Sequence, residues 1–105
     1  MTTFDDRKDA FEKKHAHDEE LAFKATARRN KLLGLWVAEQ LGLTGDAAEA
    51  YAKEVVAADL EEAGDDDVVR KVMGDLKAKN VDISEHRVRT KLAEFLETAK
   101  QQLSA

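Results

Sequence analysis

The sequence lacks cysteine and proline entirely, and aromatic residues make up only 6% of its 105 residues. The absence of cysteine excludes a disulfide framework and any metal site built on thiolates. Without proline, no helix interior is interrupted by a residue that cannot donate a backbone hydrogen bond. Alternating apolar runs between turn residues are also missing, so we expect no strands. The abundant alanine, leucine, lysine and glutamate favour an all-α fold.

The chain also has no long apolar run. None approaches the roughly 18–20 residues that a helix needs to span a bilayer. The N-terminus lacks the apolar core of a signal peptide, and its acidic residues argue against a mitochondrial transit peptide. We therefore expect a cytoplasmic protein that does not insert into a membrane. The formal net charge of −5 argues against nucleic acid as the main partner.

Apolar residues recur at helical spacing in four segments, which predict helices over about 20–41, 45–63, 66–79 and 85–103. The short connections between them suit neighbours that pack antiparallel. A chain of 105 residues can bury one modest core. The sequence therefore predicts a small four-helix bundle over residues 20–105, preceded by an N-terminal segment over residues 1–19.

The predicted core draws on all four helices. Thr44 and Ser84 are good N-caps, and Asn80 is a suitable helix end. Gly74 costs its helix roughly 1 kcal/mol relative to alanine, and we expect it to let a neighbouring helix approach closely. The expected inward-facing residues are Leu32, Leu33, Leu35, Trp36, Val37, Leu41, Ala48, Tyr51, Val55, Ala58, Val68, Val69, Val72, Met73, Leu76, Val88, Leu92, Phe95, Leu96, Ala99 and Leu103.

The N-terminal segment has a different character. Eleven of the seventeen residues from Phe4 to Glu20 are charged, and only Phe4 and Phe11 are large and apolar. Ordering each residue's backbone costs roughly 1–2 kcal/mol, whereas burying one phenylalanine contributes about 1.5–3 kcal/mol. We therefore expect the free segment to be flexible or partly helical. Phe4 and Phe11 lie two helical turns apart, which suits a helix that folds on a partner; a merely solvated tail is the alternative.

The sequence predicts no catalytic or metal site. His15 and His17 are two residues apart and so point in different directions on a helix, while His86 stands alone. There is no HExxH pattern, glycine-rich phosphate loop or nucleophile elbow. The acidic run "EEAGDDD" lacks the alternating oxygen ligands of a calcium loop, and we interpret it as a helix cap and linker. We therefore expect a protein that is not an enzyme.

Three cations in "ARRNK", Arg28, Arg29 and Lys31, fan around their helix. One interpretation is a solvated face that pairs with acidic neighbours. The other is a secondary contact surface for an acidic partner or for phosphates. The second interpretation leaves weak adenine nucleotide binding open, although we expect no tightly bound cofactor.

The run "TTFDDRKDAFEKK", followed by "HDEELAFKATARRNKLLGLW" and later by "DLEEAGDDDV", resembles an alphaproteobacterial family of small helical proteins. That family includes the zeta inhibitor subunit of the F-type ATP synthase. The resemblance covers essentially the whole chain and is most specific over residues 2–36. It implies a regulatory inhibitor that associates with the cytoplasmic face of the membrane-bound synthase.

In this family the N-terminal segment inserts into a catalytic interface between alpha and beta subunits, reaches the gamma rotor subunit and blocks rotation in the hydrolytic direction. The bundle stays outside. Where the family has an aromatic residue, usually phenylalanine, this chain has His15, which implies weaker anchoring. The resemblance assigns partner binding to Phe4, Asp5, Asp6, Arg7, Phe11, Glu12 and Lys14, with His17, Asp18 and Glu19 at the hinge of the segment.

Two other functions fit the residues without the resemblance. A helical adaptor could use the bundle surface, for example Arg28 and Arg29, and carry residues 1–19 as a tail. A regulator could sense nucleotides on its basic helix surfaces. Pull-down with and without residues 1–19 separates the adaptor from the inhibitor, and titration with ATP and ADP tests the sensor. In each case we expect a monomer when the protein is free.

Overall fold

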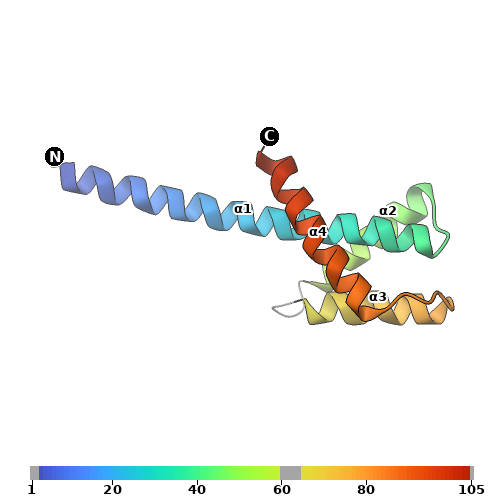
Figure 1. Ribbon diagram of the computed structural model, residues 1–105. Helices are drawn as coiled ribbons and strands as arrows, with labels where there is room; N and C mark the ends of the chain where they lie inside the picture. Colours follow the sequence, from blue (N-terminus) through green and yellow to red (C-terminus); the bar gives the residue numbers. More distant parts are fainter. Residues whose placement is uncertain (1–2, 60–64, 105) are drawn as a thin grey trace.

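The computed structural model describes the backbone of residues 3–59 and 65–104 and the side chains of residues 20–59 and 65–103. It contains the helices α1 (Thr3–Gln40), α2 (Gly45–Ala58), α3 (Asp66–Ala78) and α4 (Glu85–Ser104). None of these described residues lies in a strand. The predicted all-α, four-helix fold is therefore confirmed (Figure 1).

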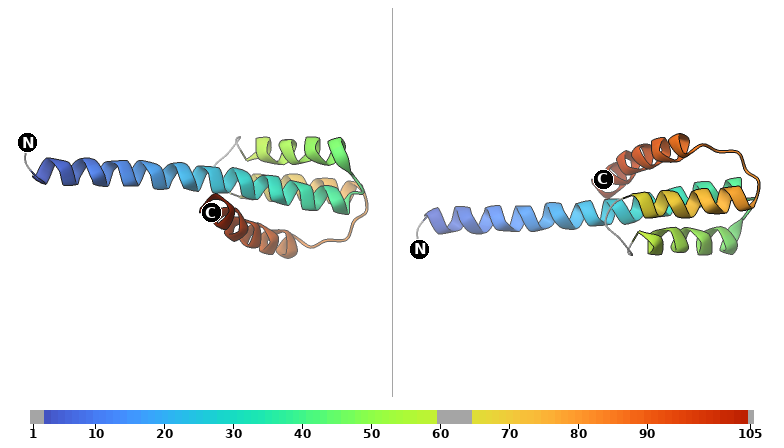
Figure 2. Two further views of the ribbon diagram at one scale, coloured as in Figure 1. Left: turned by 90° about the horizontal axis from the view of Figure 1, so that it is seen from above. Right: turned by 90° about the horizontal axis from the view of Figure 1, so that it is seen from below.

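The helix α1 is longer than the segment over 20–41 that apolar spacing predicts. Its backbone is helical without interruption from Thr3, and the molecule extends 65 Å along its longest axis. The helices α2, α3 and α4 gather around the C-terminal half of α1, and its N-terminal part projects beyond them (Figures 1 and 2). Within the bundle, α1 packs chiefly against α2 and α4, whereas α3 and α4 make a sparse contact.

Two of the helices end in the same way. Gly42 follows α1 with a φ of 80°, and Asn80 follows α3 with a φ of 58°. In each case the next residue donates a backbone hydrogen bond of 2.9 Å to the carbonyl five residues back. This pattern is the Schellman motif, which satisfies carbonyls that the helix leaves free. The prediction that Asn80 ends a helix is confirmed.

The predicted starts of α2, α3 and α4 are confirmed, but only one of the two predicted capping side chains forms its hydrogen bond. The Oγ of Ser84 accepts a hydrogen bond of 3.1 Å from the backbone N–H of Arg87. Thr44 precedes α2 in an extended conformation, but its side chain makes no capping hydrogen bond. The predicted helix over 45–63 is too long, because α2 ends at Ala58 with Asp59 as its C-cap. Residues 60–64 lie outside the described residues.

The core contains side chains from all four helices, as predicted. Trp36 and Phe95 are partly buried against it. Leu103 is instead 37% exposed, because it lies one turn beyond Ala99, the last buried residue of α4. Ala52, which the sequence did not single out, is fully buried. The core cluster consists of Leu33, Val37, Ala38, Tyr51, Val55, Val68, Val69, Val72, Leu76, Val88 and Leu92.

Gly34 allows α1 and α2 to approach each other closely. A Cβ on Gly34 would lie 2.6 Å from the Cα of Ala52 and 3.1 Å from its Cβ. Because the nearer atom is backbone, a side chain at position 34 fits only if the helices separate. Gly74, the glycine expected to allow such an approach, has no atom within 4 Å of its Cβ position. That expectation was wrong, because α3 has no closely packed neighbour at Gly74.

A hydrogen-bonded pair joins α2 to α3. The Oη of Tyr51 donates to Oδ2 of Asp75 at 2.7 Å. The Nζ of Lys71 lies 3.1 Å from the same carboxylate oxygen and 5.3 Å from the centre of the Tyr51 ring. Burial, and then the hydrogen bond to Asp75, raise the pKa of Tyr51 far above its ordinary value. The contact therefore requires a protonated tyrosine.

Gly34→Ala should lower the free energy of unfolding by about 1–3 kcal/mol, because overpacking against Ala52 outweighs the gain in helix propensity. Gly74→Ala is the matched control. It should raise the free energy of unfolding by up to about 1 kcal/mol, since nothing obstructs its methyl group. Urea denaturation followed by circular dichroism measures both changes. Midpoints that shift in the same direction would contradict the close contact assigned to Gly34.

The raised pKa of Tyr51 predicts a loss of stability in alkali. A group whose folded pKa exceeds its unfolded pKa contributes fully below the unfolded value, which is about 10 for tyrosine, and loses that contribution at higher pH. The free energy of unfolding should fall by up to about 1.4 kcal/mol per pH unit above pH 10. Tyr51→Phe should cost about 1 kcal/mol at neutral pH and show a shallower alkaline decline. Parallel pH profiles from urea denaturation would refute this assignment.

Candidate functional site

The residues predicted to bind a partner all lie on the projecting N-terminal part of α1. Their backbone is helical, including at the predicted hinge over 17–19. Their side chains lie outside the described residues, so their contacts stay a prediction, as does the division of the chain between residues 19 and 20. The structure presents to a partner one helix that stands clear of the other three (Figure 2). The residues are Phe4, Asp5, Asp6, Arg7, Phe11, Glu12, Lys14, His17, Asp18 and Glu19.

The bundle begins to enclose α1 near Ala25. That residue is 2% exposed and is the first buried position among the described side chains of α1. Just before it, Phe23 is 66% exposed. Lys24 forms an exposed ion pair of 3.0 Å with Glu20, one turn earlier on the same helix. The transition from projecting helix to packed helix therefore takes about one turn.

One turn further into the bundle, α1 carries two buried polar residues. Arg29 is 5% exposed and Asn30 is 1% exposed. The Nε and Nη2 of Arg29 donate to Oδ1 of Asn30 at 3.1 and 2.9 Å. Its Nη1 lies 3.0 Å from Oδ1 of Asp65, and the Nδ2 of Asn30 donates to Oδ2 of Asp59 at 2.9 Å. We call these four residues the Arg29 clasp; it ties α1 to the C-cap of α2 and the N-cap of α3.

The cations of the predicted secondary surface occupy different environments. Arg28 is exposed, and its Nε donates to Oε1 of Gln102 on α4 at 2.8 Å. The side chain of Lys31 is 45% exposed and lies 4.0 Å from Glu49 on α2. Arg29 lies inside the bundle. Contact with a partner or a nucleotide through this surface stays a prediction, with Arg28 and Lys31 as the cations that solvent reaches.

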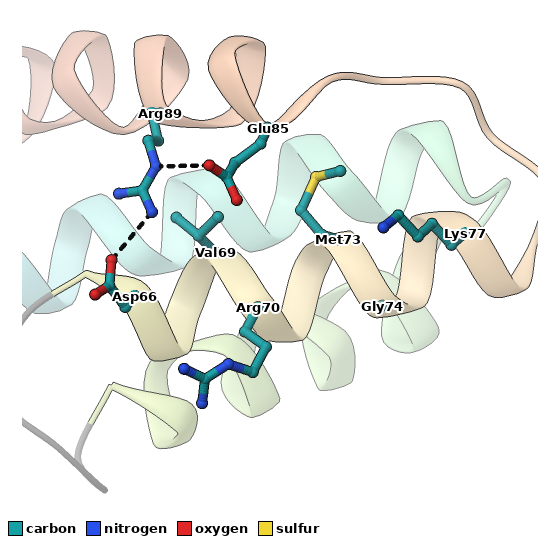
Figure 3. Close-up of a pocket in the computed structure, with 8 residues that line it drawn as sticks. All are labelled: Asp66, Val69, Arg70, Met73, Gly74, Lys77, Glu85 and Arg89. Carbon is teal, nitrogen blue, oxygen red and sulfur yellow. Dashed lines mark hydrogen bonds and ion pairs between the residues drawn. The ribbon is translucent and has the colours of Figure 1, made fainter.

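A groove of about 500 Å³ lies between α3 and α4. Figure 3 shows Val69 and Met73 of α3 pointing toward α4. At one end, Arg89 bridges Asp66 at 3.0 Å and Glu85 at 3.4 Å. These pairs satisfy one another, and no buried side-chain polar atom among the described residues lacks a hydrogen-bond partner. The charged groups at this end of the groove are therefore paired with one another.

The described residues also hold no group of three or more His, Asp or Glu side chains arranged to bind a metal ion. His86 is exposed at the start of α4. The side chains of His15 and His17 lie outside the described residues. Within the described residues, no helix combines the length and apolar character needed to cross a membrane.

Sequence reasoning missed Asn30, Asp59 and Asp65. The available signal was the position of Arg29, which falls four residues after Ala25 and four before Leu33, on the inward face of α1. A charged residue at such a position requires a partner inside the fold. The sequence therefore indicates that Arg29 needs an acidic partner, but it does not show which of the many acidic residues is that partner.

Two of three comparisons with known proteins found a match. The family model described as ATPase inhibitor subunit zeta matches residues 1–102. A protein whose structure was determined by solution NMR is similar, with 60% sequence identity and a TM-score of 0.70; the match covers 78% of this chain and 93% of that one. The comparison with curated proteins found no match.

The family match extends over nearly the whole chain and confirms the resemblance drawn from the N-terminal motifs. An ATPase inhibitor has a regulatory and non-catalytic role, and its partner is an ATPase. The similar NMR structure supports the fold. The chain therefore belongs to the ATPase inhibitor subunit zeta family.

Proposed function

We propose that the chain inhibits ATP hydrolysis by an F-type ATP synthase through the projecting part of α1. Residues 1–19 insert at a catalytic interface between alpha and beta subunits, reach the gamma subunit and block rotation in the hydrolytic direction. Family membership supports the role of ATPase inhibitor. The observation that supports this finer mechanism is the shape of α1, a single helix that continues past the rest of the bundle (Figure 1).

A helix that projects alone lacks the packing contacts that would stabilise it. An isolated helix of this length is marginal in water, because packing rather than intrinsic propensity supplies most helix stability. Phe4 and Phe11 are seven residues apart, so they recur after two turns of the helix and suit a groove on a partner. The three other helices surround α1 only from about Ala25 onward. In this proposal they remain outside the interface and dock the inhibitor there.

The proposal includes where and in what form the chain acts. It binds as a monomer at the cytoplasmic face of the membrane-bound synthase, and it requires no cofactor. His15 takes the place of a family aromatic residue, so one anchor of the segment is polar. Phe4 and Phe11 then carry a larger share of the apolar contact than they would beside a third aromatic residue.

Deleting residues 1–19 should abolish inhibition and leave the bundle folded, because the described core begins at Ala25. The half-inhibitory concentration should rise at least about 100-fold, as expected when the central anchors of an interface are removed. Steady-state ATP hydrolysis by a purified alphaproteobacterial synthase measures inhibition, and a cooperative thermal transition by circular dichroism reports the fold. Equal inhibition by the folded truncated protein and the full chain would refute the mechanism.

Phe11→Ala should weaken inhibition more than Lys13→Ala. A buried aromatic anchor contributes about 2 kcal/mol at an interface, which corresponds to roughly a 30-fold change in half-inhibitory concentration. An exposed charge contributes up to about 1 kcal/mol, so Lys13→Ala should stay within roughly fivefold. Both residues lie in the same segment, which makes Lys13→Ala the matched control. The opposite ranking in the same hydrolysis assay would rule out Phe11 as an anchor.

A further inference from the structure

We propose that the Arg29 clasp sets the register of α1 in the bundle. By doing so it determines how far the inhibitory segment projects and which of its faces is presented to the ATPase. Arg29 and Asn30 are then positioning residues that act through α1 and need not touch the partner. The proposal rests on the function proposed above, and it concerns residues that lie inside the bundle.

Burying the charge of Arg29 costs free energy. It lies on the inward face of α1, four residues from Ala25 and from Leu33, and it is 5% exposed. Removing a charge from water costs more than a single ion pair usually recovers, and apolar replacements of similar size often stabilise a protein as well or better. The best-attested use of such buried polar groups is to specify one register among several.

The acidic partners in the clasp lie at the ends of two other helices. Asp65 occupies the N-cap position of α3, where an aspartate ordinarily accepts a hydrogen bond from the start of its own helix. Here its side chain makes no capping bond, and its Oδ1 lies 3.0 Å from Nη1 of Arg29. Asp59, the C-cap of α2, accepts from Asn30 at 2.9 Å. Arg29 and Asn30 of α1 thus bind the residues at both ends of the connection between α2 and α3.

The clasp forms in only one position of α1. A shift of α1 by four residues would place Leu33 opposite Asp65 and leave Arg29 buried without its carboxylate. Gly34 restricts the contact with α2, because an added Cβ there meets Ala52. The clasp adds a tie to the start of α3, and it lies nearer to the projecting part than Gly34 does. Together the two contacts define both the rotation and the axial position of α1.

A displacement of α1 at the clasp is carried along the helix to the projecting segment. α1 is continuous from Thr3 through Arg29, and position 4 lies about 37 Å from position 29 along the helix axis. An axial slip of one turn moves the whole segment by about 5.4 Å, and a slip of one residue rotates its apolar stripe by about 100°. Either displacement is enough to misalign two phenylalanines with the pockets of a fixed partner.

The test begins with the double variant Arg29→Met/Asn30→Leu, which exchanges the polar pair for apolar side chains of similar size. Because the chain contains no cysteine, Lys24→Cys and Lys53→Cys place the only two spin labels at exposed positions of α1 and α2. Double electron–electron resonance then measures the distance between the labels. We expect one narrow distribution with the native clasp and a broadened, shifted or bimodal distribution in the double variant. A narrow distribution at the unchanged distance overturns the proposal.

Inhibition of ATP hydrolysis supplies the second readout, with the full chain carrying the same substitutions but no labels. We expect the half-inhibitory concentration to rise at least tenfold while the melting temperature stays the same or increases. Gln102→Met, which removes the exposed bond between Arg28 and α4 without changing α1, is the matched control and should stay within twofold. Undiminished inhibition by a variant whose label distances have broadened also overturns the proposal.

A third variant keeps the test decisive if the double variant does not fold. Asp65→Ala removes the carboxylate partner of Arg29 from a side chain that is 47% exposed, and the same two outcomes apply to it. Failure of the proposed function shows up differently. In that case the chain lacking residues 1–19 would inhibit as well as the full chain, whereas the distance distributions would still report whether the clasp holds α1 in register.

Discussion

At Gly34 the backbone of α1 lies closer to α2 than any side chain at that position would permit. This contact makes α1 and α2 a pair and turns Leu33 and Val37 of α1 toward Val55 of α2 in the core. The third helix is joined to that pair through Tyr51 and Asp75, and α4 packs against the other side of α1. The contacts of α3 and α4 therefore depend on the position of α1 against α2, which requires a glycine at position 34.

Close packing of this kind leaves little room for polar groups, yet Arg29 and Asn30 are buried beside it. Their hydrogen bonds reach the C-cap of α2 and the N-cap of α3. Apolar contacts alone would favour burial without choosing strongly between neighbouring registers, whereas directional hydrogen bonds are lost when a helix slips or turns. The core therefore combines a steric constraint at Gly34 with a polar constraint at Arg29.

The proposed mechanism depends on one helix that lies in two environments. From about Ala25 onward α1 is packed among three other helices, and its N-terminal part projects beyond them (Figure 1). A lone helix gains stability when a partner covers it, and the family is one of ATPase inhibitors. Because the helix is continuous, the bundle fixes the direction of the segment that we propose to be inhibitory.

Features that depend on near neighbours along the chain could be predicted from the sequence. The apolar stripe of α3, with Val68, Val72 and Leu76, follows from helical periodicity, and Ser84 and Asn80 act through bonds to residues three to five positions away. The motifs of the first 36 residues likewise carried the family assignment, which the match over residues 1–102 confirmed.

The sequence by itself thus determined the helical class, the number of helices and the family. Only the tertiary structure decided that Gly34, and not Gly74, lies against another backbone. It also decided that Arg29 turns inward to Asp65, while Arg28 is exposed and the Lys31 side chain is half-exposed. Both outcomes depend on which helix lies opposite, and that choice follows from packing between segments far apart in the chain, about which local spacing carries no information.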